Sequence, residues 1–178
     1  MQKLKFLKCA VPLVVISTII ALILALVNAI TADRIAENEI SERENAIKSI
    51  FPACDSFEDF DYSSESVARM GRVFDAEKNL IGYYANATPT GFKGEISLMV
   101  GIDGEFKVID VVLISAAETP GVGTKATEKS HLDKFASLGK DEIATVDTIT
   151  GATITSKAVR VGIQKAVAAV ESVVTEEK

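Results

Sequence analysis

The sequence is poor in the side chains from which metal sites and nucleophilic active sites are built. Its 178 residues include one histidine, two cysteines and no tryptophan. Cys9 and Cys54 form no Cys-x-x-Cys pair, and His131 has no second histidine or cysteine near it in the sequence. Metal centres, disulfide frameworks and Cys–His or Ser–His–Asp catalysis each need several such groups together. We therefore expect no metal site, no structural disulfide and no hydrolytic active site.

Positive charge is scarce outside the N-terminus. The formal net charge is −6, and the first 30 residues carry three lysines and no acid, so the remainder carries −9. Nucleic-acid affinity depends on Lys and Arg contacts to phosphates. The acidic remainder of the chain therefore argues against nucleic acid as a partner.

One long apolar run, residues 10–30, contains no charged residue. As a helix it would be about 31 Å long, enough to cross the hydrocarbon core of a membrane. Lysines precede the run and acidic residues follow it, which predicts residues 1–9 in the cytoplasm, a single transmembrane helix in the cell membrane, and the rest of the chain outside. The alternative is a cleaved signal peptide with Val27-Asn28-Ala29 as its cleavage site. A signal's apolar region usually has only about 7–15 residues, so an uncleaved anchor in contact with lipid is favoured.

The chain after the anchor has the pattern of one α+β domain. A charged helix is predicted over residues 32–50, ending at Phe51-Pro52, followed by an acidic, irregular surface segment at residues 53–67. We assign residues 31–67 as a connecting segment and residues 68–178 as the outer domain. Four antiparallel strands are predicted, at residues 72–76, 80–86, 94–102 and 106–115, with Asp103-Gly104 as the hairpin turn between the last two.

Helical patterns dominate the C-terminal third. A short helix is predicted over residues 127–138, a short strand over 144–147, and a long helix over 156–174. The long helix carries an apolar stripe that reads as core: Val159, Ile163, Val167, Val170 and Val174. The expected fold is thus an antiparallel sheet packed by helices.

The most informative segment, residues 147–155, immediately precedes that helix and reads Asp-Thr-Ile-Thr-Gly-Ala-Thr-Ile-Thr. Unpaired N–H groups and the macrodipole at a helix N-terminus favour a negative group. A small, hydroxyl-rich turn there suits a phosphate, either bound or esterified. The alternative is an ordinary threonine N-cap, which spacing alone favours.

A second segment, residues 116–125, reads Ala-Ala-Glu-Thr-Pro-Gly-Val-Gly-Thr-Lys. Its two glycines and proline indicate a shaped loop. Glycines allow the backbone to approach a flat ligand closely, and Thr119 offers a hydrogen bond. Taken alone, such a loop is more often a plain connector.

Together the two segments resemble a known family. The run at residues 147–153 is similar to the flavinylation motif of FMN-binding domains, an Asp followed by Ser/Thr-Gly-Ala-Thr. The run at residues 118–123 resembles the Glu-Thr-Pro-Gly-Leu-Gly signature of the G subunit of the Rnf electron-transport complex, departing from it only at Val122. The C subunit of the sodium-pumping NADH:quinone reductase shares the first motif but is usually a longer chain.

The resemblance implies FMN attached covalently, through a phosphoester, to Thr153. An ApbE-type flavin transferase would take FAD, with magnesium, and release AMP. Gly151 and Ala152 would keep the turn small. Asp147 and Thr150 would belong to the recognition or phosphate shell.

Further site residues follow from the same resemblance. Thr155 is assigned to the phosphate shell or, alternatively, as the helix N-cap. Independently of the resemblance, Lys157 is a candidate to offset the charge of a nearby anion, and Lys125 is a weaker candidate because an exposed lysine is most often just solvated. The loop beside the isoalloxazine is carried over as Glu118, Thr119, Val122 and Gly123.

The function implied is that of an electron-transfer subunit in a membrane-bound, ion-translocating ferredoxin:NAD oxidoreductase. Its partners would be the other membrane subunits of that complex, and it would have no complete active site of its own. A second reading is a free-standing, membrane-anchored flavoprotein, although a reductase should carry further cofactor motifs or Cys-x-x-Cys-His, and neither is present. A third is an adhesion or scaffold domain without flavin.

Overall fold

The computed structural model describes residues 2–62, 64 and 66–176, without the side chains of residues 2–10, 33 and 36. The chain divides into two compact units, Met1–Ser41 and Glu42–Lys178. The predicted cytoplasmic segment, residues 1–9, has no described side chains.

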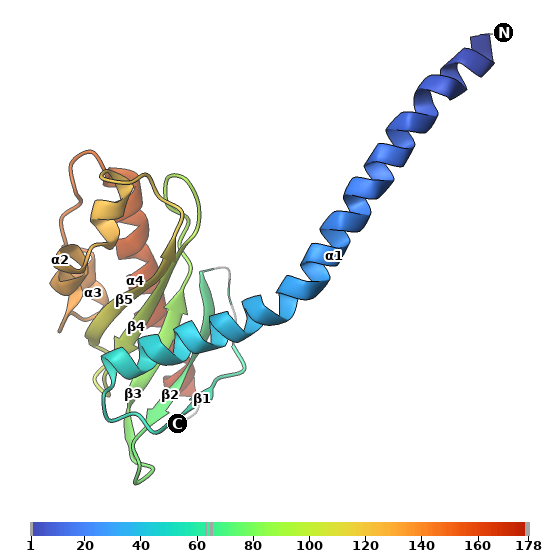
Figure 1. Cartoon of the computed structure of the whole chain (residues 1–178). Coiled ribbons are helices and arrows are strands. Elements are labelled where there is room, and N and C mark those ends of the chain that lie inside the picture. The colour runs from blue at the N-terminus through green and yellow to red at the C-terminus, as the bar shows by residue number, and fades with distance from the viewer. Residues whose placement is uncertain (1, 63, 65, 177–178) are drawn as a thin grey trace. The chain divides into compact units, whose positions relative to one another are not determined.

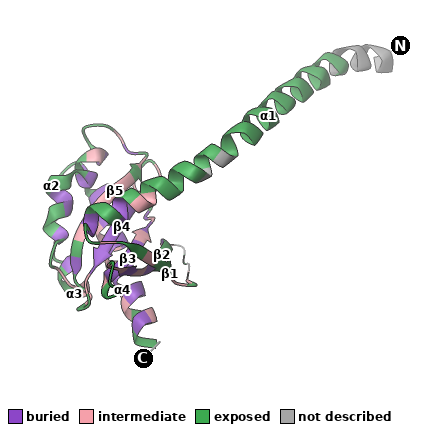
Figure 2. Cartoon of the chain, turned by 60° about the horizontal axis from the view of Figure 1, so that its bottom comes forward, coloured by how far each residue is buried: buried purple, intermediate pink, exposed green. Residues whose placement is uncertain are grey.

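The first unit is the larger part of helix α1 (Gln2–Ile50). Its described side chains from residue 11 to residue 41 are exposed (Figure 2). Within Val11–Ile50 the mean hydropathy reaches 2.8, and by length and composition this is the one helix among the described residues that could cross a membrane. The prediction of separate helices at residues 10–30 and 32–50 is wrong. Neither glycine nor proline follows residue 30 before Pro52, so nothing ends the first helix there.

The second unit contains a five-stranded sheet in which every neighbouring pair is antiparallel (Figure 1). The order in the sheet is the order along the chain. This confirms the predicted α+β class with an antiparallel sheet. The strands are β1 (Ser56–Asp59), β2 (Val67–Phe74), β3 (Leu80–Ala87), β4 (Ile96–Ile102) and β5 (Val108–Ala116).

Strand β1 lies in the segment predicted to be irregular, so the expectation of about four strands is corrected. Its residues Ser-Phe-Glu-Asp are mostly exposed and lack an apolar alternation that could be read from the sequence. It pairs with β2 from Ser56↔Phe74 to Asp59↔Gly71. Gly71 permits this pairing, because a Cβ there would lie 2.0 Å from the carbonyl oxygen of Glu58.

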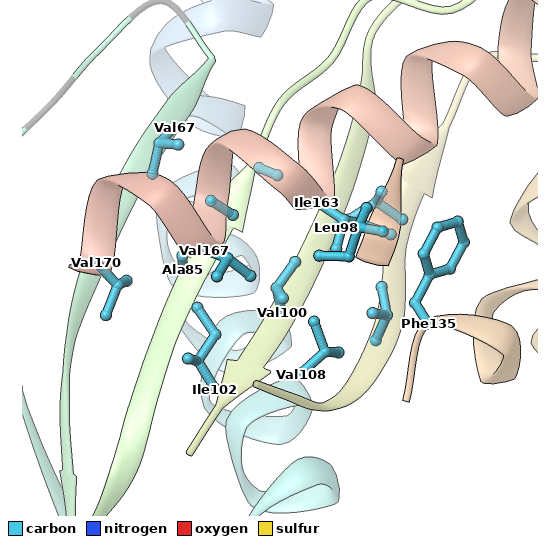
Figure 3. Packing of buried hydrophobic residues seen from close by; sticks show 14 of the residues in the cluster. Val67, Ala85, Leu98, Val100, Ile102, Val108, Phe135, Ile163, Val167 and Val170 are labelled. Atoms are coloured by element: carbon cyan, nitrogen blue, oxygen red, sulfur yellow. The ribbon is translucent and has the colours of Figure 1, made fainter. Parts of the chain in front are cut away.

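Helix α4 (Thr153–Glu176) covers one face of the sheet. Figure 3 shows Ile163, Val167 and Val170 of this helix against strand residues that include Leu98 and Val100. All five residues of the predicted stripe are buried, which confirms it as core. The helix begins three residues earlier than predicted.

Short helices complete this side of the sheet. The predicted helix at residues 127–138 is broken into pieces, and the predicted strand at 144–147 is a turn. Arg160 explains the turn, because its guanidinium donates to the carbonyl oxygens of Ala144 (3.2 Å) and Val146 (3.0 Å), so these oxygens are already engaged. The short helices here are η1 (Gly123–Thr127), α2 (Lys129–Leu132), η2 (Asp133–Phe135) and α3 (Lys140–Ile143), of which α2 and η2 lie within the predicted range.

The opposite face is covered by the last turns of α1, within the second unit. Ile47, Ile50 and Phe51 pack on a cluster that includes Tyr84 and Met99. Strand β4 is therefore buried on both faces. The apolar residues Ile96, Leu98, Val100 and Ile102 alternate along this strand, but Met99 on the other face is fully buried as well.

Candidate functional site

A cleft of about 450 Å³ lies in the second unit, between the loop after β5 and the start of α4. Both segments singled out from the sequence border it, although residues 126–146 separate them along the chain. Its volume falls in the range typical of small-molecule sites. The lining residues are Phe92, Glu118, Thr119, Val122, Gly123, Gly151, Ala152, Thr153, Ile154 and Thr155.

The loop after β5 is folded by its own hydrogen bonds. The carbonyl oxygen of Thr119 accepts the N–H groups of Val122 (3.2 Å) and Thr124 (3.3 Å). The N–H of Gly121 donates to the Thr124 hydroxyl oxygen at 2.9 Å. Gly121 has a φ of +73°, which favours glycine. The predicted shaped loop is present, and it places Thr119 and Val122 on the cleft.

The turn before α4 brings the second motif to the same cleft. Gly151 has a φ of +84°, and the N–H of Ala152 donates to the carbonyl oxygen of Ile149 at 2.9 Å. Ser156 fixes this turn on the helix, because its hydroxyl oxygen accepts the Ile149 N–H (3.1 Å) and its O–H donates to the Ala152 carbonyl (2.8 Å). Thr153 is the first residue of α4 and therefore lies where free N–H groups attract an anion.

The motif's threonines lie in different surroundings. Thr153 is exposed and lines the cleft, whereas Thr155 is only 2 % exposed and donates its hydroxyl to a Glu118 carboxylate oxygen at 3.2 Å. Thr150 and Asp147 are exposed and are not among the residues that line the cleft. The N-cap alternative for Thr155 is wrong, because the helix begins two residues before it.

Glu118 is buried, with 7 % of its surface exposed. One carboxylate oxygen accepts the main-chain N–H groups of Phe92 (2.7 Å) and Lys93 (3.2 Å), and the other accepts the Thr155 hydroxyl. The resemblance placed Glu118 beside the isoalloxazine. In the structure its oxygens are engaged by three donors of the protein itself.

Two cleft residues were missed in the sequence. Phe92 and Ile154 are 65 % and 57 % exposed, and both line the cleft. Together with Val122 they account for three of the five large apolar side chains exposed on the described part of the second unit. The sequence feature that could have identified Phe92 as a site residue is its position in the glycine- and proline-containing segment 88–94. The candidates Lys125 and Lys157 are not among the residues that line the cleft.

The cleft suits a flat aromatic group joined to a phosphate. Phe92, Val122 and Ile154 offer apolar contacts to a ring system, while the α4 N-terminus and the Thr153 hydroxyl offer N–H and O–H groups to an anion. These features fit FMN, which combines an isoalloxazine with a phosphate.

Comparison with known proteins agrees with this geometry. The model of the FMN-binding domain family matches residues 91–168. The G subunit of an ion-translocating oxidoreductase complex from Methanosarcina acetivorans is 30% identical over 172 residues, covering 90% of this chain and 92% of that protein. The chain belongs to the family of Rnf G subunits.

Other members of the Rnf G family are similarly close. The G subunit of the Na(+)-translocating ferredoxin:NAD(+) oxidoreductase complex of Acetobacterium woodii is 28% identical, over 90% of this chain and 89% of that protein. The G subunit of the proton-translocating ferredoxin:NAD(+) oxidoreductase complex of Clostridium ljungdahlii is 30% identical, over 82% and 81%. In this member of the Rnf G family, the match to the FMN-binding domain includes every residue that lines the cleft.

Proposed function

We propose that this chain is an electron-transfer subunit of an Rnf-type, ion-translocating ferredoxin:NAD oxidoreductase, and that it carries FMN in the cleft. The observation that carries the proposal is the convergence of both flavin-family motifs on one cleft at the N-terminus of α4. FMN supplies reversible one- and two-electron chemistry when bound, and the protein supplies position and electrostatics. The names of the relatives as ferredoxin:NAD(+) oxidoreductase subunits support this role.

The proposed attachment point is the Thr153 hydroxyl. Residues 147–155 contain four threonines, at positions 148, 150, 153 and 155, and only Thr153 is both exposed and on the cleft. The Thr155 hydroxyl is buried and engaged by Glu118, while Thr150 lies away from the cleft lining. A phosphate diester at Thr153 would be stabilised by the helix N-terminus by about 0.3–1 kcal/mol.

The attachment step balances as a phosphoryl exchange. The Thr153 oxygen forms a bond to the FMN-side phosphorus of FAD, and the bond from that phosphorus to the bridging pyrophosphate oxygen breaks. AMP leaves with the bridging oxygen, and the hydroxyl proton is released. The family resemblance supports a separate flavin transferase with magnesium as the catalyst of this step.

The proposed topology follows from the first 50 residues. Residues 10–30 would cross the cell membrane once, with the lysine-bearing residues 1–9 in the cytoplasm and the FMN domain, residues 68–178, on the outer side. The exposed, apolar surface of α1 at residues 11–30 would contact lipid and the other membrane subunits. Covalent attachment would prevent loss of FMN from a domain that faces the exterior.

A coexpression experiment tests this function. Full-length protein is produced with a flavin transferase, and flavin fluorescence is read from the band in a denaturing gel. Wild type and Thr148→Ala should fluoresce and Thr153→Ala should be dark, because only the latter loses the acceptor hydroxyl. A fluorescent Thr153→Ala band would refute the attachment site. A dark wild-type band, with the transferase active on a control protein, would refute covalent attachment of FMN to this chain.

A further inference from the structure

A buried carboxylate ties together the three segments that form the cleft. Glu118 comes from the loop after β5, Phe92 and Lys93 from the loop between β3 and β4, and Thr155 from the first turn of α4. All three partners donate to it, two from the main chain and one from a buried side chain. Hydrogen bonds to a carboxylate are stronger than those between neutral groups.

The surrounding backbone is shaped to admit this carboxylate. A Cβ placed on Gly91 would lie 2.1 Å from one Glu118 carboxylate oxygen, and a Cβ on Gly123 would lie 2.3 Å from the other. No residue other than glycine fits at either position while Glu118 keeps its hydrogen bonds. Two loops distant in sequence therefore both leave room for the same side chain.

We propose that Glu118 is a positioning residue of the flavin site and not a flavin ligand. Its carboxylate holds the Phe92 loop against the first turn of α4 and thereby sets the Phe92 ring relative to Thr153 across the cleft. Both carboxylate oxygens are engaged by the protein, so the side chain acts through these segments. The effect of Glu118 on the flavin rests on the proposed function. The hydrogen bonds from Phe92, Lys93 and Thr155 to Glu118 are present in the protein without FMN.

Loss of the Glu118 hydrogen bonds should loosen the Phe92 loop but leave the Thr153 hydroxyl, the proposed attachment point of FMN, in place. In Glu118→Ala the N–H groups of Phe92 and Lys93 lose their acceptor, and their hydrogen exchange should accelerate by about 10- to 100-fold. Covalent FMN should still form, because the Thr153 hydroxyl is intact. The attached flavin should nevertheless show lower fluorescence anisotropy and weaker visible circular dichroism, because the wall that carries Phe92 is no longer fixed.

Conservative replacement should rescue the site. In Glu118→Gln the amide oxygen can accept both main-chain N–H groups, and the amide nitrogen can donate to the Thr155 hydroxyl, which also accepts hydrogen bonds. Exchange at Phe92 and Lys93 and the flavin spectra should then stay within about threefold of wild type. Glu128→Ala, which removes an exposed glutamate close to the same loop, is the matched control and should change neither.

The experiment is hydrogen exchange with mass spectrometry on the full-length chain in detergent, before and after flavin loading. The expected result is fast exchange at residues 92–93 in Glu118→Ala, unchanged exchange in strand β4, and rescue in Glu118→Gln. Wild-type exchange at residues 92–93 in Glu118→Ala would overturn the proposal, as would equal effects of Ala and Gln. If Glu118→Ala fails to fold, Thr155→Val keeps the test open, because it should still weaken visible dichroism. Failure of the proposed function is seen separately, as absence of the covalent adduct in wild type.

Discussion

Helix α4 packs closely against Pro89 at Gly162. Two opposing effects therefore decide whether an alanine at this position raises or lowers the free energy of unfolding. A Cβ on Gly162 would lie 2.7, 3.0 and 3.0 Å from the Cγ, Cβ and Cδ atoms of Pro89. Gly162 is buried, and the Pro89 carbonyl is held by the Ile96 N–H at 2.9 Å. The substitution Gly162→Ala therefore places a methyl group against a rigid ring that cannot rotate away.

The magnitudes favour a net loss of stability. Alanine is better than glycine inside a helix by about 1 kcal/mol. Overpacking of a core contact costs about 1–3 kcal/mol, and three ring atoms within 3.0 Å put this site in the upper part of that range. We expect Gly162→Ala to lower the free energy of unfolding by about 1–2 kcal/mol. For a unit of this size that corresponds to a fall in Tm of about 3–8 °C.

Tyrosine fluorescence of the full-length protein without flavin offers a suitable assay. The chain has no tryptophan and three tyrosines, all in the second unit, so the signal reports unfolding of that unit alone. In a Pro89→Ala background the Cγ and Cδ atoms are gone, and Gly162→Ala should then stabilise by up to about 1 kcal/mol. The same loss in both backgrounds, or a gain in the presence of Pro89, would show that the helix–proline contact does not limit this position.

Two pH-dependent predictions come from titratable groups elsewhere in the same unit, the buried His131 and the exposed Asp59. Burial, and to a smaller extent the charge of Lys134, holds the pKa of His131 below its ordinary value of about 6.5, so the free energy of unfolding should fall as pH drops below that value. In His131→Leu the urea midpoint should therefore depend less on pH between about pH 8 and 5.5. The same pH dependence in wild type and variant would contradict this. Burial raises the pKa of Asp59, but hydrogen bonds from Tyr84, Arg43 and Arg69 outweigh it, so the net pKa is below the usual range. The stabilisation by Asp59 should be present at about pH 7 and lost progressively as pH falls below about 4. Because Asp59 is exposed and its charge is screened by solvent, Asp59→Asn should cost only about 0.5–1 kcal/mol in urea unfolding at neutral pH. The cost should shrink as the pH is lowered, and an equal cost at neutral pH and at about pH 3 would refute the prediction.

The parts of the fold that were predictable are those whose signal is local. The stripe of α4 and the hairpin at Asp103-Gly104 follow from periodicity and turn chemistry, and the structure has both. Strand β1 could not be predicted, because its acidic residues are largely exposed and its pairing depends on Gly71 of a partner strand. The double burial of β4 depends on Ile47 and Ile50 from α1, a tertiary contact that no strand pattern reveals.

The same distinction applies to the site. The two motifs were recognisable as sequence segments, and their meeting at one cleft agrees with the family resemblance. The contacts of Glu118 were not predictable, because its hydrogen-bond partners lie 26, 25 and 37 residues away in the chain. Phe92 was missed because a single exposed aromatic residue in a loop carries no periodic signal.

The most direct test of the account is the mass of the peptide that contains Thr153. Full-length protein matured with a flavin transferase would be digested and fragmented by tandem mass spectrometry. The account predicts an added mass of FMN less one water, located on Thr153 and absent from Thr150 and Thr155. Flavin mass on either of those threonines, or an unmodified peptide from protein matured by an active transferase, would contradict it.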